Sequence, residues 1–225
     1  MKKVSRYKYL LLMWFKGLIP IKNLRIVLFV LGGLLLLTAG AIFLVQWQEG
    51  EAAARSAQVL LDESGIAPNI SSKSATQDIP VPSPEKTAGP LPSDLQGYDV
   101  IARLDIAKLD LSLPVLSETS DKALKVSACR YQGTEPGAKG NLVITGHDYR
   151  SGAIFGHLNK MDVADKVILT GKSGKTYAYI VYAVNHIKPD EAEVLNDTEY
   201  VSELSILTCE NSGNGRLLVR CRLED

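Results

Sequence analysis

The chain has 225 residues, of which 46% are hydrophobic, and its 25 basic and 25 acidic side chains give a formal net charge of zero. The balance conceals an asymmetry, because residues 1–25 contain seven Lys or Arg and no Asp or Glu. A basic end alone would suit nucleic acid, but the long apolar run that follows it favours a membrane, so no nucleic-acid partner is expected.

Residues 26–45 (IVLFVLGGLLLLTAGAIFLV) are uncharged. At ~1.5 Å per residue, twenty helical residues match a hydrocarbon layer of ~30 Å. The positive charges before this run, with Glu49 and Glu51 after it, predict a cytoplasmic segment at 1–25 and an extracytoplasmic remainder. A cleaved signal peptide with a processing site at 52–54 is the alternative, but signal cores usually have only about 7 to 15 apolar residues. We therefore expect an uncleaved single-pass signal anchor in the cell membrane.

Residues 46–96 divide into two stretches of different composition. The first, up to about Ser64, is rich in alanine and predicts a helical juxtamembrane stalk. The second, residues 66–96, contains six prolines among serines and threonines. Such a composition buries too little apolar surface to fold, so we expect an extended tether.

Residues 97–225 are long enough for one folded domain. Apolar and polar residues alternate where strands with one buried face are expected. The predicted strands are 100–106, 109–115, 141–146, 166–170, 175–184, 205–209 and 216–223, with a hairpin turn at 171–174 and short helical pieces at 120–128 and 154–160. The pattern is mainly β and predicts a compact mixed β-barrel with a few helical connections.

Three reactive side chains lie where predicted strands meet loops. Cys209 ends the apolar run SILTC, Arg216 begins the next strand, and His147 follows the strand NLVITG. A thiolate can attack a carbonyl, an imidazole can protonate a leaving amine, and a guanidinium can stabilise an oxyanion. Together they predict cysteine-dependent acyl transfer.

Each assignment has a structural alternative. Cys209 could be an inert buried thiol, since free cysteine is among the most buried residue types. His147 could be an ordinary hydrogen-bonding loop residue. Arg220 lies on the same side of its strand as Arg216, so a shift of register would exchange their roles. His157 and His186 are expected on the surface, the latter in a solvated loop.

The combined motifs resemble the sortases, membrane-anchored cysteine transpeptidases of Gram-positive bacteria. The resemblance covers the anchor, the stalk and the whole domain, through IARLDIAKLDLSLPVL, GTEPGAKGNLVITGH with His147, and ILTC followed by Arg216. It implies a closed eight-stranded mixed β-barrel with short helices after one N-terminal transmembrane helix. The histidine loop GHDYRSGAIFGHLNKM is similar to that of class B members, whereas the compact domain is similar in size to classes A and D.

The resemblance also implies roles for individual residues. Cys209 would attack the Thr–Gly bond of an LPXTG-like sorting signal and form a thioacyl enzyme. His147 would protonate the departing amine and later deprotonate the acceptor, while Arg216 would hold the oxyanion. Thr208 would help to position the substrate. Partners would be sorting signals of secreted surface proteins, with an amine of a peptidoglycan precursor or of a pilin as the acceptor.

Two other activities remain open. A membrane-tethered cysteine hydrolase would use the same residues and release its product to water. A pilin-polymerising sortase is disfavoured because the tether contains no Asp-Pro-aromatic lid motif. Anchoring of surface proteins to the cell wall is therefore the expected function.

No cofactor is expected from the sequence. Some sortases bind calcium through acidic loops, and a site of that kind could be built from Glu118, Asp121, Asp190, Glu191 and Glu193. A disulfide between Cys129 and Cys221 is compatible with a free Cys209, but both residues are expected to act as small apolar core residues.

Overall fold

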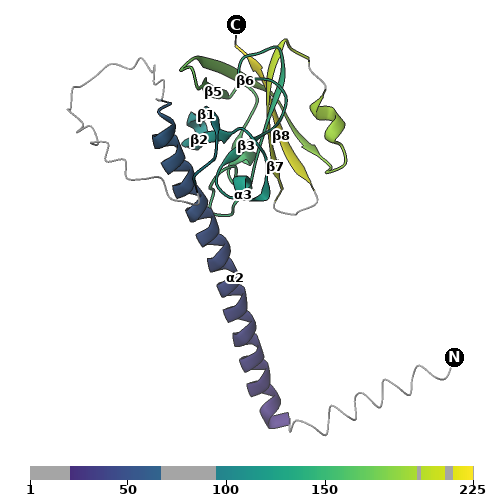
Figure 1. Ribbon diagram of the computed structural model, residues 1–225. Coiled ribbons are helices and arrows are strands. Elements are labelled where there is room, and N and C mark those ends of the chain that lie inside the picture. The colour runs from purple at the N-terminus through teal and green to yellow at the C-terminus, as the bar shows by residue number, and fades with distance from the viewer. Residues whose placement is uncertain (1–20, 67–94, 197–198, 211–214, 225) are drawn as a thin grey trace, which may run out of the picture. The chain divides into compact units, whose positions relative to one another are not determined.

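The computed structural model describes residues 21–66, 95–196, 199–210 and 215–224 (Figure 1). Most of the predicted cytoplasmic segment and of the Pro/Ser-rich tether lies outside the described residues. The chain separates into two compact units, Met1–Val45 and Gln46–Asp225, and each is described by itself.

The first described element is α2 (Ile21–Ser64), a 44-residue helix that begins in the first unit and ends in the second. Its apolar stretch contains the predicted span 26–45, and these side chains are exposed. With a mean hydropathy of 2.6 over its most apolar window, it is the one described helix long and apolar enough to cross a membrane.

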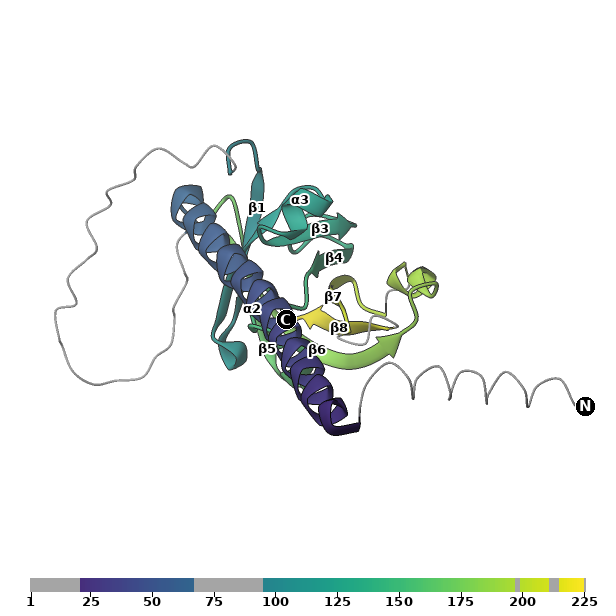
Figure 2. The same ribbon diagram turned by 90° about the horizontal axis from the view of Figure 1, so that it is seen from below.

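The second unit contains a closed barrel of eight strands (Figure 1). They are β1 (Val100–Ile106), β2 (Leu111–Leu116), β3 (Ala128–Gln132), β4 (Gly140–Gly146), β5 (Lys166–Gly171), β6 (Thr176–Ile187), β7 (Ser202–Cys209) and β8 (Arg216–Leu223). Around the barrel their order is β1-β2-β3-β4-β7-β8-β6-β5. Figure 2 shows the same strands from below.

The barrel is mixed because two of its neighbouring pairs are parallel. These are β2 with β3 and β4 with β7, and the other pairs are antiparallel. The prediction of a closed eight-stranded mixed β-barrel is therefore confirmed. The parallel β4–β7 pair aligns Gly146 with Thr208, and the antiparallel β7–β8 pair aligns Cys209 with Arg216.

Strand β7 is buried along both faces up to its last residue. On its inner face Leu204 and Ile206 join the main core of the barrel. On its outer face Leu207 packs with Val143 and Leu218 below a 3-10 helix, η3 (Ala192–Leu195). Leu207 therefore lies on the same side of β7 as Cys209, because alternate residues of a strand face the same side.

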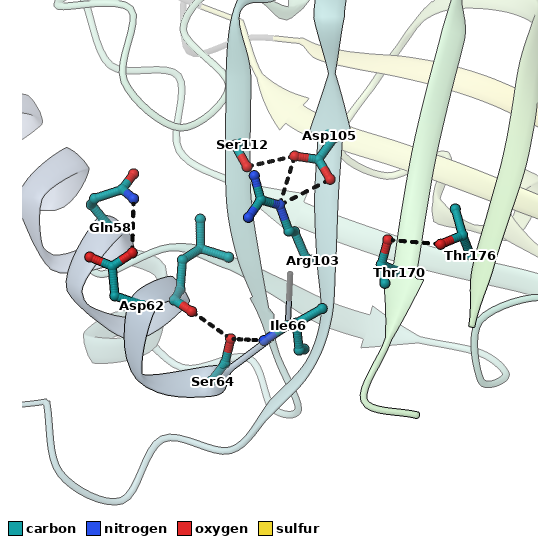
Figure 3. Close-up of polar contacts among 10 residues, drawn as sticks. Gln58, Asp62, Ser64, Ile66, Arg103, Asp105, Ser112, Thr170 and Thr176 are labelled. Atoms are coloured by element: carbon teal, nitrogen blue, oxygen red, sulfur yellow. Dashed lines mark hydrogen bonds and ion pairs between the residues drawn. The ribbon is translucent and has the colours of Figure 1, made fainter. Parts of the chain in front are cut away.

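Polar contacts fix the register of the neighbouring strands (Figure 3). On β1 the Arg103 Nε donates to both carboxylate oxygens of Asp105, at 2.9 and 3.1 Å. The hydroxyl of Ser112 on β2 donates to the same carboxylate at 2.6 Å. These bonds link the pair Asp105↔Ser112 across the two antiparallel strands β1 and β2.

The connections differ from the prediction. The helix expected at 120–128 is only α3 (Asp121–Leu124), capped by the Ser120 hydroxyl, which accepts from the Ala123 N–H at 3.1 Å. Strand β3 starts as early as Ala128 because it pairs with both β2 and β4. The helix expected at 154–160 is a single 3-10 turn, η2 (Leu158–Lys160).

Strand ends also differ by a few residues. Strand β2 begins two residues later than predicted, because the 3-10 turn η1 (Ala107–Leu109) ends at Asp110 in the left-handed region, with φ 49°. Strand β6 extends past residue 184 to Ile187, since β8 pairs with it over that whole length.

The C-terminal part of α2, residues 46–64, lies in the same compact unit as the barrel. Ala53 and Ala57 are buried in the main core cluster, and Leu60 belongs to a second cluster with Val100 and Leu116. The segment expected as a stalk is therefore helical, and one of its faces is packed against the folded domain.

Candidate active site

Cys209 is the one exposed residue of β7 and ends that strand. Arg216, the first residue of β8, lies directly opposite it in the ladder. Directly opposed residues of an antiparallel pair have Cα atoms about 4.5 to 5.5 Å apart, so their side chains leave the sheet as neighbours. The hairpin thus displays a thiol beside a guanidinium.

His147 reaches the same place from β4. It follows Gly146, whose partner in the parallel register is Thr208, so His147 and Cys209 leave adjacent strands at the same end of the barrel. Both line a cavity of about 460 Å³. The other lining residues are Gln46, Glu49, Lys125, Asp148, Tyr149, Arg150 and Glu210.

The loop that carries His147 is held by its own backbone. We call residues 147–157 the histidine loop. The Phe155 N–H donates to the His147 carbonyl at 3.0 Å, and the Gly152 N–H donates to the Tyr149 carbonyl at 2.9 Å. Gly156 must be glycine, because a Cβ there would lie 2.1 Å from the Tyr149 carbonyl oxygen. The Tyr149 ring meets the His147 ring edge to face, with centroids 5.4 Å apart.

Arg216 and Arg220 have different surroundings. The Arg216 Nη1 donates to the neighbouring Gly215 carbonyl at 3.1 Å, next to Cys209. The Arg220 Nη2 forms an ion pair with the buried Glu203 at 2.9 Å, and Arg220 lies over the Tyr182 ring. The register therefore places Arg216, and not Arg220, beside the thiol.

Thr208 faces the interior of the barrel rather than the side of Cys209. Its hydroxyl is buried and donates to the Gly146 carbonyl at 2.8 Å. This bond ties the end of β7 to the end of β4, which fixes the spacing of the strands that carry Cys209 and His147. Thr208 and Cys209 also line a second cavity of about 190 Å³ at the barrel mouth.

His186 lines the second cavity, a position that was not predicted from the sequence. It lies within β6, paired with Leu217 of β8, and not in a loop as expected. Its Nδ1 contacts the Glu210 carboxylate, although most of the ring is exposed. The two side chains meet because β6 continues to Ile187 and because Glu210 directly follows Cys209 at the end of β7.

Charges near His147 oppose one another. Burial lowers the pKa of the imidazole, and the positive charge of Lys125 lowers it further. Asp121 and Glu49 raise the pKa of the same group by smaller amounts. The net direction is downward, so neutral imidazole is favoured near neutral pH more than in a free histidine.

Replacing Lys125 with glutamine should raise the pKa of His147, because a positive charge that disfavours imidazolium is removed. The imidazolium form would then persist to higher pH. NMR titration of the His147 ring in a Cys209→Ala background measures this without interference from the thiol. Lys122→Gln in α3 is the matched control, since Lys122 is not among the charges that act on His147. An unchanged or lowered pKa in Lys125→Gln would contradict the assignment.

The other two cysteines are chemically different from Cys209. All three are free thiols, and Cys129 and Cys221 are buried. Burial raises the pKa of Cys129 to about 12, and it also raises the pKa of Cys221. Both behave as small core residues, and no disulfide links them.

Acidic side chains do not gather around a possible metal site in the part of the chain that the structure describes. No three His, Cys, Asp or Glu side chains there are arranged to hold an ion.

An exposed thiol, an imidazole and a guanidinium at the ends of neighbouring barrel strands define a site suited to cysteine-dependent acyl transfer. A model of the sortase domain family matches residues 104–224, more than half of the chain. The chain belongs to the sortase family.

Individual relatives agree with this family. The chain is 30% identical to Sortase A of Bacillus anthracis over 118 residues, which are 52% of this chain and 55% of that protein. It thus spans about half the length of the curated relatives it matches.

Solved structures are similar in fold as well. Sortase A from Corynebacterium diphtheriae is 28% identical with a TM-score of 0.53, over 57% of this chain and 62% of that one. Clostridium perfringens sortase C, solved with the C-terminal cell wall sorting motif, is 26% identical with a TM-score of 0.52, over 60% of this chain and 77% of that one.

Proposed function

We propose that this protein is a cysteine transpeptidase that cleaves an LPXTG-like sorting signal between Thr and Gly and transfers the acyl group to an amine of the cell wall. The observation that carries the proposal is the shared position of Cys209, Arg216 and His147 at the ends of three barrel strands. Membership of the sortase family supports the same activity.

The chemistry proceeds through a thioester. The Cys209 thiolate attacks the threonine carbonyl carbon, and the Arg216 guanidinium stabilises the oxyanion that forms. The C–N bond then breaks, and His147 gives its proton to the departing glycine amine. An incoming amine next attacks the thioester carbonyl while His147 accepts a proton, and the thiolate leaves. The products are a new amide and the original enzyme.

The cavity that contains Cys209 and His147, about 460 Å³ in volume, provides the place for the donor peptide beside the thiol. The outer face of β7 and β8 does not, because Leu207 and Leu218 are buried there beneath η3. Tyr149 gives the wall of the cavity an aromatic surface, against which an apolar side chain of a sorting signal can pack. The sorting-motif complex of Clostridium perfringens sortase C supports a peptide of this kind as the substrate.

The long apolar part of α2 supports a location in the cell membrane. The excess of positive charge before it favours a cytoplasmic N-terminus, which puts the catalytic barrel outside the cytoplasm. The donor would then be a secreted surface protein. The acceptor would be an amine of a peptidoglycan precursor, as expected for a Gram-positive cell wall.

Intact mass spectrometry of the full chain in detergent micelles tests this function. The protein is incubated with LPXTG-type peptides, with and without an added amine. A thioacyl adduct that the amine converts into ligated peptide supports transpeptidation. An adduct that gives only hydrolysed peptide at every amine concentration favours the hydrolase alternative, and a pilin-derived lysine as the one effective amine favours a pilin-polymerising enzyme.

Replacing Arg216 with alanine should lower kcat by about 10²- to 10³-fold, because a donor to the developing oxyanion is lost. Lysine at this position should recover only part of the loss, since it lacks the planar fork of donors. Steady-state cleavage of a fluorogenic sorting peptide measures both variants. Arg222→Ala, near the other end of the same strand, is the control, and an Arg216→Ala enzyme as active as this control would rule out the role.

A further inference from the structure

The helix segment that leads into the folded domain touches the histidine loop. Gly50 is buried in this contact, and a Cβ at that position would lie 1.9 Å from Ser151 Oγ and 3.3 Å from Tyr149 Cβ. A larger residue here requires the Ser151 side chain, or the loop that carries it, to shift. The helix and the loop therefore meet with no spare space between them.

The contact continues along one face of the helix. Buried residues recur at positions 50, 53, 57, 60 and 61, the spacing of a single helical face. Ala53 and Ala57 are 1% exposed, and Leu60 and Leu61 are 3% exposed. Their exposed neighbours include Glu51 and Ala54. The segment is thus docked on the domain as an amphipathic element.

The same loop carries His147, so the docked helix acts on the reactive group through few intermediates. Tyr149 packs edge to face on the His147 ring, and its backbone carbonyl accepts a hydrogen bond from the Gly152 N–H within the loop. A shift of the Tyr149–Ser151 stretch would move the imidazole directly. Gln46 and Glu49 also form part of the wall of the cavity that contains His147 and Cys209.

Charged groups of three elements face His147. Asp121 lies in α3, Lys125 follows that helix, and Glu49 lies in α2. Asp148, Arg150 and Glu210 line the same cavity. Of these, Glu49 is the one group that the helix segment contributes, and its negative charge favours protonated His147.

We propose that residues 46–64 of α2 are a positioning element of the active site, in which Gly50 lets the helix pack against the histidine loop and Glu49 places a carboxylate in the wall of the cavity that His147 and Cys209 line. The inference rests on the proposed transpeptidase function, in which His147 must give a proton to the leaving amine. It assigns to a membrane-proximal helix a part in the chemistry that follows from neither its length nor its composition.

Two substitutions, one of which should compensate for the other, test the contact of Gly50 with Ser151 in the full chain in detergent micelles. Gly50→Ala should lower kcat for peptide cleavage about tenfold with a smaller change in KM, because the new Cβ displaces Ser151 and with it the imidazole. Ser151→Gly removes the side chain that the Cβ would meet, so Gly50→Ala/Ser151→Gly should recover kcat to within about twofold. Ala54→Val, exposed on the same helix, is the control for altered helix propensity. Full activity of Gly50→Ala, or a double variant as slow as Gly50→Ala, would overturn the proposal.

A second readout needs no turnover. In a Cys209→Ala background, NMR titration of the His147 ring should show a lower pKa in Glu49→Gln and an unchanged pKa in Glu51→Gln. Gly50→Ala should move the His147 ring resonances, and Ser151→Gly should restore them. If wild-type protein forms no thioacyl adduct, the proposed function fails while this titration still decides the positioning role. Identical titrations in all variants would overturn that role.

Discussion

Cys209→Ala should abolish peptide transfer, with kcat reduced by about 10⁴-fold or more, because no other side chain at the site can form the thioester. Binding of the sorting peptide should persist, since the other residues that line the cavity are unchanged. Intact mass spectrometry should show the acyl adduct on the wild type and none on the variant. A peptide-binding assay on the same sample separates lost chemistry from lost binding.

The buried thiols provide an internal control for that experiment. Cys129 and Cys221 remain in the Cys209→Ala protein, and burial raises the pKa of each, so neither should become acylated. An adduct of the same mass on the variant would show that another nucleophile carries the reaction. Residual cleavage above one part in a hundred would likewise contradict the role of Cys209.

Local sequence signals were enough for most of the strands, though not for β3, and for one edge of the site. The seven-residue separation of Cys209 and Arg216 contains a glycine-bearing turn between two apolar runs, so a hairpin with these residues next to its turn was predictable. Strand alternation likewise located β1 and β8 to the residue. In these cases the information lies within about fifteen residues of chain.

The rest depends on contacts distant in sequence. His147 lies 62 residues before Cys209, and the parallel pairing of β4 with β7 brings them together. The end of the strand NLVITG marked His147 as a candidate, but no local signal showed which strand lies beside it. The contact of His186 with Glu210 similarly requires β6 to pair with β8 along its whole length. The alternation of residues within a strand does not show which other strand it pairs with, so neither the β4–β7 nor the β6–β8 pairing could be predicted from it.

The helix at 46–64 shows why burial is hard to predict for small residues. Alanine favours a helix whether it is exposed or buried, so the composition predicted a helix and not its docked face. Ala53 and Ala57 are buried because they face the main core of the folded domain, whereas Ala52 and Ala54 on the same helix are exposed. The side that is buried is decided by the domain and not by the helix.

The buried Glu203 near the start of β7 should be the most sensitive position for stability. Its carboxylate accepts hydrogen bonds from Arg220 and the Tyr182 hydroxyl, both at 2.9 Å, and from the Tyr200 N–H at 2.7 Å. The side chain is fully inaccessible to solvent, and that of Arg220 is 12% exposed. The network joins β6, β7 and β8 at the end of β7 opposite Cys209.

Glu203→Ala should lower the free energy of unfolding by about 3 to 5 kcal/mol, because it leaves the Arg220 charge buried without its carboxylate. Urea unfolding of the full chain in micelles, followed by near-UV circular dichroism of the barrel, measures the loss. Glu191→Ala, which breaks an exposed pair with Lys188, is the control and should cost less than about 1 kcal/mol. Because the cost arises from an Arg220 charge that has lost this carboxylate, Glu203→Leu with Arg220→Met should be more stable than Glu203→Ala alone. If the double variant were the less stable of the two, the remaining Arg220 charge would not be the cause of the loss, and the role assigned to it would be wrong.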